Sequence, residues 1–151
     1  MEPNRVLFLA VAFLTHAFVG YALVRGFTDA DPRLGIVFGL LPDGDFLFPV
    51  VWEWPFVHRG ITHTPLFALT VVGSAYALSS RSRESAAAVG LAIGSHLAID
   101  SLSPRGIDWL FPIETTWSPG LPVHSPITTG LLWAVSITIL VSQSTDPRSN
   151  E

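Results

Sequence analysis

The chain alternates between long apolar stretches and short polar segments. Residues 6–24 run for 19 positions without a charged group, which is close to the ~20 residues that cross a bilayer core. Four further stretches are largely apolar: 34–52, 66–78, 86–102 and 127–141. This pattern predicts an all-α fold, a polytopic transmembrane helical bundle of about four or five spans.

Local signals refine two of these stretches. Pro42 and Gly44 interrupt the second one, so we expect a broken segment there, and broken backbone at membrane depth is stable only against protein or a wet cavity. Thr64 and Pro65 are a typical N-cap and first helical residue, and they predict the start of the third helix. The first stretch is too long for the core of a signal peptide and contains His16, which favours a retained helix.

The expected organisation is one transmembrane helical domain over residues 1–141 and a polar C-terminal tail over 142–151. Five spans would place the chain ends on opposite sides of the membrane. The arginines then divide between the two sides: Arg25, Arg33, Arg81, Arg83 and Arg148 against Arg5, Arg59 and Arg105. The positive-inside rule makes the first side cytoplasmic, and a re-entrant second segment would invert everything after it.

Composition supports a membrane protein and excludes several other classes. Hydrophobic residues make up 49% of the chain and charged residues 13%, about half the charged fraction of a soluble domain, and so apolar a chain is not disordered. The sequence has no cysteine, which excludes disulfides, a thiolate zinc site and a cysteine nucleophile. Its formal net charge of −4 argues against a nucleic-acid partner.

Ionisable side chains lie in or beside the apolar stretches. An aspartate at the centre of a span costs about 2.5–3.5 kcal/mol, so Asp43, Asp45 and Asp100 need compensation. A divalent cation would provide it, because carboxylate and imidazole groups are its ligands and its charge neutralises theirs. The histidines His16 and His96 lie in spans of their own and are candidate ligands.

Spacing indicates how these groups could act together. His96 and Asp100 are four residues apart, which puts both on one face of a helix, one turn apart. Asp43 and Asp45 flank Gly44, and a turn there can direct both carboxylates inward. The alternative is structural: a histidine bonded to a neighbouring helix, and a polar turn that reaches the membrane interface.

The segment HRGITHT, residues 58–64, brings two more histidines. His58 and His63 are five residues apart and do not share a helix face, so we interpret the segment as a loop that carries ligands toward the next helix. Arg59 between them suits a phosphate or carboxylate oxygen. An interfacial basic loop is the competing interpretation.

Other polar and aromatic residues receive weaker assignments. His124, Glu53 and Glu114 are left open as further members of the site. The tryptophans outside the last span predict an interfacial aromatic belt: Trp52, Trp54, Trp109 and Trp117.

Three motifs together resemble a known family. PDGD (residues 42–45), HRGITHT (58–64) and HLAIDSLSPRGIDWLFPI (96–113), with His16 in the first span, resemble the membrane-bound metal-dependent hydrolases, a family that includes a LexA-regulated inner-membrane protein. The resemblance covers roughly residues 16–113. The family pattern usually reads PDxDH, whereas Phe46 follows Asp45 here, which leaves His124 open as a substitute ligand.

The resemblance implies a multi-pass protein of the cell (inner) membrane that hydrolyses an ester or phosphoester by a metal-activated water. It implies seven ligands or near-ligands: His16, Asp43, Asp45, His58, His63, His96 and Asp100. Seven groups are more than the three or four ligands of a mononuclear zinc site, so the set has room for more than one ion. Zinc is favoured, with manganese or iron as alternatives. Arg59 and Asp45 are the expected catalytic residues, and the expected substrate is a membrane lipid or other amphipathic phosphoester.

Two other functions use the same residues. A small metal- or proton-coupled transporter could use the intramembrane His/Asp cluster as an ion pathway, with the broken segment at its binding site. A b-type haem could be held between His16 and His96, although haem needs none of the aspartates. A membrane scaffold whose polar groups pair with one another is the plainest interpretation.

Overall fold

The computed structural model describes residues 3–49, 51–113 and 115–144. It contains five α-helices: α1 (Pro3–Phe27), α2 (Arg33–Leu40), α3 (Pro65–Leu78), α4 (Arg83–Leu102) and α5 (Pro126–Ser144). Two 3₁₀ helices, η1 (Pro42–Leu47) and η2 (Ile61–His63), lie between α2 and α3, and an antiparallel pair, β1 (Ile107–Asp108) and β2 (Thr116–Trp117), lies between α4 and α5. The expected all-α bundle is confirmed.

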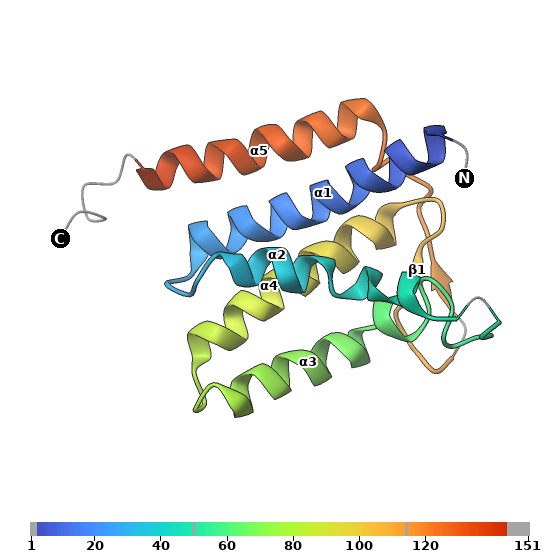
Figure 1. The fold of residues 1–151 in the computed structure, drawn as a ribbon, viewed down its shortest axis with the longest axis horizontal. Coiled ribbons are helices and arrows are strands. Elements are labelled where there is room, and N and C mark those ends of the chain that lie inside the picture. Colours follow the sequence, from blue (N-terminus) through green and yellow to red (C-terminus); the bar gives the residue numbers. More distant parts are fainter. Residues whose placement is uncertain (1–2, 50, 114, 145–151) are drawn as a thin grey trace.

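Successive helices run in alternate directions, so both long connections meet at one end of the bundle (Figure 1). α1 packs against α2, α4 and α5, and α4 packs against α1, α2 and α3. We call the end with residues 41–64 and 103–125 the loop end. At the other end, the turn end, the described chain has the short connections 28–32 and 79–82.

Three helices in the described part of the chain are long and apolar enough to cross a membrane: Asn4–Phe27, Arg83–Leu102 and Pro126–Ser144. α3 has 14 residues and is about 21 Å long, and α2 has eight and is about 12 Å long, both shorter than a bilayer core of about 30 Å. The second apolar stretch is broken, as expected, because α2 ends just before Pro42 opens η1.

Glycines let α1 and α2 approach closely. A Cβ on Gly35 would lie 2.3 Å from the backbone oxygen of Gly20, and a Cβ on Gly39 would lie 2.8 Å from the backbone oxygen of His16. Small residues allow such backbone contact between helices in lipid. The contact fixes the end of α2 beside the middle of α1, and η1 begins from that position.

The helix ends agree with the local signals in one case and correct the boundary in another. Thr64 caps α3 by accepting a hydrogen bond from the Phe67 amide, and Pro65 is the first helical residue, so the predicted start is confirmed. α5 continues to Ser144, three residues into the expected tail. Gln143 donates to the backbone oxygen of Gly26 at 3.0 Å, which holds this last turn against α1.

Candidate metal centre

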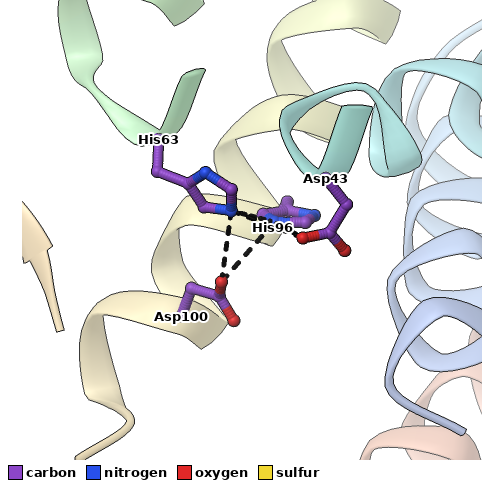
Figure 2. A group of neighbouring side chains, drawn as sticks. All are labelled: Asp43, His63, His96 and Asp100. Atoms are coloured by element: carbon purple, nitrogen blue, oxygen red, sulfur yellow. Dashed lines mark hydrogen bonds and ion pairs between the residues drawn. The ribbon is translucent and has the colours of Figure 1, made fainter. Parts of the chain in front are cut away.

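Four acidic and imidazole side chains from three elements meet at the loop end (Figure 2). His96 and Asp100 come from α4, one turn apart as their spacing predicts, while Asp43 comes from η1 and His63 from η2. We call these four residues the Asp/His group. Their side chains point toward one another, and His63, His96 and Asp100 are fully buried.

The ligand atoms of the group enclose one point. The two histidine Nε2 atoms are 3.1 Å apart. Asp100 Oδ2 lies 3.5 Å from Nε2 of His63 and 3.6 Å from that of His96. Asp43 Oδ1 lies 3.5 and 3.8 Å from the same two atoms. Ligands about 2.0–2.1 Å from a tetrahedral zinc ion are about 3.3–3.4 Å from one another, so the spacing fits a small divalent ion.

Both imidazoles are oriented through their other nitrogen. His96 Nδ1 lies 2.7 Å from the backbone oxygen of Gly39, and His63 Nδ1 lies 3.1 Å from Asp45 Oδ2. A carbonyl oxygen and a carboxylate only accept hydrogen bonds, so both Nδ1 atoms carry the proton. Such outer partners fix the ring and its tautomer in metal sites and leave Nε2 free to ligate.

The tautomers leave the centre of the group electron-rich. Two Nε2 lone pairs cannot face each other at 3.1 Å unless a proton or a metal ion lies between them. The surrounding charges favour a cation as well, because three aspartates (Asp43, Asp45 and Asp100) accompany one arginine, a formal charge of −2 with neutral histidines. Charge, donor type and spacing therefore fit one divalent cation.

Asp45 lies behind the group rather than at its centre. Besides His63, its carboxylate accepts hydrogen bonds from the Arg59 amide at 3.0 Å and the Thr62 hydroxyl at 2.9 Å, and it lies 3.0 Å from His58 Nδ1. Burial raises the pKa of Asp45, but the hydrogen bonds with His58 and His63 outweigh burial and hold that pKa well below its usual range. Asp45 is thus an ionised acceptor that orients His63.

Arg59 is held against Asp100. Its Nη2 lies 3.0 Å from Asp100 Oδ1, while Nη1 donates to the backbone oxygen of Asp100 and to the hydroxyl of Ser103. The residue has a positive φ of 68°, and the next residue is Gly60, whose Cβ would lie 2.1 Å from the backbone oxygen of Pro55. This strained turn brings the guanidinium across the loop end to α4.

His16 and His124 lie on the other side of Asp100. Their Nε2 atoms are 3.4 and 3.6 Å from Asp100 Oδ1, so these three residues form a second group that could hold a cation. Within the described chain, His16 Nδ1 is buried and has no hydrogen-bond partner, and the ion pair with Arg59 is the shortest contact of the buried Asp100 Oδ1. A cavity of about 50 Å³ lies beside both groups and is lined by Asp43, Asp100, His16 and His124 among others. It has room for a few water molecules.

The structure thus sorts the predicted site residues by position. Asp43, His63, His96 and Asp100 meet at the centre, His16 lies beside it, and Asp45 and His58 lie behind His63. His124, which the sequence left open, joins the site. Glu53 is exposed in a different part of the loop and lines a separate groove, and Glu114 lies outside the described residues.

Three contributors were not predicted: Gly39, Thr62 and Ser103. Gly39 provides a backbone oxygen for His96, Thr62 a hydroxyl for Asp45, and Ser103 a hydroxyl for Arg59. The Gly35–Gly39 spacing, a small-xxx-small pattern typical of close helix packing, is the one signal that could have directed attention to Gly39.

The comparison with known protein families agrees with this architecture. The model of the family described as YdjM inner membrane protein matches residues 11–149. The chain belongs to the YdjM inner membrane protein family. No curated protein and no solved structure shows a significant match.

Membership in the YdjM family and the three long apolar helices together place the protein in the inner membrane, as expected. The family description names a location and no activity.

Proposed function

We propose that this protein is a membrane-embedded, metal-dependent hydrolase acting on a phosphoester or ester of a lipid-like substrate. The observation that carries the proposal is the convergence of two Nε2 atoms and two carboxylate oxygens, 3.1–3.8 Å apart for the five pairs that involve a histidine. Both imidazoles are turned by outside partners so that Nε2 faces the centre. Preorientation of this kind is typical of metal ligands.

The residues of the site would have two kinds of role: some would hold the ion, and others would act on the proton or the water beside it. The Asp/His group would hold the ion, and zinc, manganese and iron all suit two imidazoles and two carboxylates. When bound, the ion would supply a Lewis acid that lowers the pKa of water and polarises a phosphoryl or carbonyl oxygen. Asp45 keeps the proton of His63 on Nδ1, and the small cavity limits the water near the group to a few molecules.

Arg59 would stabilise negative charge beside the ion. Its guanidinium lines the small cavity and is fixed by contacts to Asp100 and Ser103, so it needs no reorganisation when charge develops nearby. Because Arg59 already places a positive charge 3.0 Å from Asp100 Oδ1, we propose one resident ion rather than a second at His16 and His124.

His16 and His124 then remain as polar groups on the cavity side. Both line the small cavity with Nε2 near Asp100 Oδ1, the oxygen that faces away from the Asp/His group and that Arg59 also contacts. There a proton can be taken from water or given to a leaving group. His124 lies outside the spans, and burial lowers its pKa despite the opposing effect of the Asp100 charge. It is therefore neutral near pH 7 and able to accept a proton.

The proposal is tested with the full-length protein purified in detergent and assayed for release of phosphate or acid from a panel of long-chain phospholipids and polyprenyl phosphates. We expect turnover of at least one class that depends on the bound zinc, manganese or iron, is lost when a chelator removes the ion, and is lost in Asp100→Ala. The control is Glu84→Gln, an exposed carboxylate on the same helix at the turn end. Metal-loaded protein that turns over nothing in the panel would overturn the proposal.

The two rival functions are distinguishable. A haem between His16 and His96 conflicts with the geometry, because their rings stack with centroids 3.8 Å apart and van der Waals contact leaves no space for a porphyrin. A transporter would exchange its ion during purification, whereas a resident cofactor stays bound. Stoichiometric metal retained through size-exclusion chromatography therefore favours the hydrolase.

A further inference from the structure

A larger cavity lies outside the small one and shares six lining residues with it. Its volume is about 410 Å³, within the range of small-molecule sites. Three arginines line it, from α1, from the loop after η1 and from the loop after α4: Arg5, Arg59 and Arg105. We call this cavity the arginine vestibule. No carboxylate is among its lining residues in the described chain.

Two of the three vestibule arginines have no ion-pair partner among the described residues. Arg5 and Arg105 are exposed, and neither forms an ion pair with a carboxylate of residues 3–49, 51–113 or 115–144. Among the described carboxylates, Arg59 forms an ion pair only with Asp100, which also belongs to the Asp/His group. Like charges gathered around a cavity repel one another, and a bound anion relieves that repulsion.

The vestibule also has an apolar part to its lining. Phe8 and Leu9 come from the start of α1 and Phe46 from η1. Phe8 is 51% exposed and Phe46 40%. α1 is long and apolar enough to span a membrane, and Arg5 lies one turn before Phe8, which is the order expected for a helix end with its arginine among lipid headgroups and its phenyl ring just below them.

The arginines and the apolar lining of the vestibule together favour one class of ligand. Three guanidinium groups suit a phosphate that carries two or more negative charges, and Arg binds phosphate oxygens in a fixed, bidentate geometry. A zwitterionic headgroup would bring an ammonium group for which the described lining has no carboxylate. A free phosphate would leave the apolar part of the lining uncovered.

We propose that the arginine vestibule binds the phosphate-monoester or diphosphate headgroup of a long-chain lipid, with the chain along Phe8 and Phe46, and delivers it to the Asp/His group. As an account of the substrate this rests on the proposed hydrolase function. As a binding site it stands separately, because Arg5, Arg105 and Phe8 have no part in the Asp/His group or its supports. The substrate class is thereby narrowed from lipid esters in general to anionic lipid phosphates.

The test uses three probes that differ by one feature each: hexadecylphosphonate, whose P–C bond resists hydrolysis, hexadecylphosphocholine, which is zwitterionic, and methylphosphonate, which has no chain. Binding to the full-length, metal-loaded protein is measured in a neutral detergent by native mass spectrometry and by the shift in melting temperature. We expect one hexadecylphosphonate per chain, bound at least tenfold more tightly than either other probe.

The variants assign the site. Arg5→Gln/Arg105→Gln is expected to weaken hexadecylphosphonate binding at least tenfold, with metal content unchanged. The matched control, Arg81→Gln/Arg83→Gln at the turn end, is expected to bind like the wild type. Equal binding of hexadecylphosphocholine, equal binding of methylphosphonate, or a double variant that binds as well as its control would each overturn the proposal.

The two proposals fail differently. A protein that binds hexadecylphosphonate through Arg5 and Arg105 but retains no metal would contradict the hydrolase and keep the vestibule as a lipid-phosphate site. A protein that retains metal and cleaves an ester but binds the phosphonate no better than its controls would contradict only the vestibule.

Discussion

At the turn end of the bundle, polar side chains are exposed or partly buried and bond to backbone, whereas at the loop end ionisable side chains are buried and also bond to one another. Ser82 accepts from the Ser85 amide and Asp31 from the Arg33 amide, two or three residues away. At the loop end His96 bonds to Gly39 and Arg59 to Asp100, 57 and 41 residues apart. The first set ends and begins helices, and the second holds groups that no helix end requires.

The contrast shows where function is located in this fold. Both ends must connect helices, and the turn end does so with residues 28–32 and 79–82. The loop end uses much longer connections and buries ionisable groups, which is costly in a membrane protein. Buried charge without a local structural reason is the feature that distinguishes the candidate site. Matched substitutions at the two ends test this distinction.

The largest effect is expected from Asp100→Asn, which keeps the shape of the side chain but removes its charge from both candidate cation positions. We expect metal affinity to fall at least about a hundredfold, since even outer partners of ligands cost 10–100-fold. Isothermal titration with zinc measures the change. Glu84→Gln at the turn end should bind zinc like the wild type, and equal losses in both variants would show that the two ends do not differ.

A smaller loss is expected from Gly39→Ala. The added Cβ would lie 2.8 Å from the backbone oxygen of His16, so α1 and α2 must separate and the carbonyl that holds His96 must move. We expect a loss of roughly 1–3 kcal/mol in unfolding free energy and weaker metal binding. Gly94→Ala in α4, which has nothing within 4 Å, should stabilise the helix by up to about 1 kcal/mol. If Gly94→Ala destabilised the protein more than Gly39→Ala, the close contact between α1 and α2 would not be what holds this region together.

Metal binding should depend on pH through His63. Burial lowers its pKa, but hydrogen bonds to Asp100, Asp43 and Asp45 outweigh burial and raise the pKa to about 10. Near pH 7 the metal-free residue is thus protonated at Nε2, and an ion must displace that proton. Zinc affinity should fall about tenfold per pH unit between pH 9 and pH 7, with one proton released per ion. Titration in buffers of different ionisation enthalpy measures the release, and zero protons would contradict the mechanism.

The same proton has the opposite effect on the metal-free protein. A raised pKa means that the folded state binds the proton more tightly than the unfolded chain, whose histidine pKa is 6.5. The stabilisation is complete below that value and is lost as the pH rises through about 10. Metal-free protein should therefore melt at lower temperature toward pH 10, whereas metal-loaded protein should not.

The smallest effect is expected from Thr62→Val, which keeps the volume but removes the hydroxyl that donates to Asp45 and contacts His63. We expect about a tenfold loss of zinc affinity with the fold intact. Thr28→Val is the matched control, because the Thr28 hydroxyl donates to the Val24 carbonyl at the turn end. Equal losses of zinc affinity in Thr28→Val and Thr62→Val would show that the turn end and the loop end do not differ.

The sequence predicted the positions of the helices because each depends on a local signal. Apolar runs located all five segments, Pro42 located the break, and Thr64 with Pro65 located the start of α3. The lengths of the helices were harder to predict from the sequence. α2 is only eight residues long because it ends before Pro42, and the apolar pattern of residues 34–52 continues past that point without showing that the rest forms η1 and a loop.

The candidate site was predictable in its residue types and only partly in its arrangement. The four-residue spacing on one helix correctly paired His96 with Asp100. The separate positions of Asp43 and Asp45, one facing the group and one behind it, follow from the 3₁₀ turn of η1 and from contacts with Thr62 and His58. These partners come from a loop more than ten residues away, so tertiary packing decides them.

The central claim is that the Asp/His group holds one resident metal ion, and elemental analysis of the detergent-purified protein tests it most directly. The wild type should carry close to one zinc, manganese or iron per chain after size-exclusion chromatography. His96→Ala/Asp100→Ala should carry none, and Glu84→Gln should keep the wild-type amount. Folded wild type that holds no metal and takes up none when divalent ions are added would contradict the account.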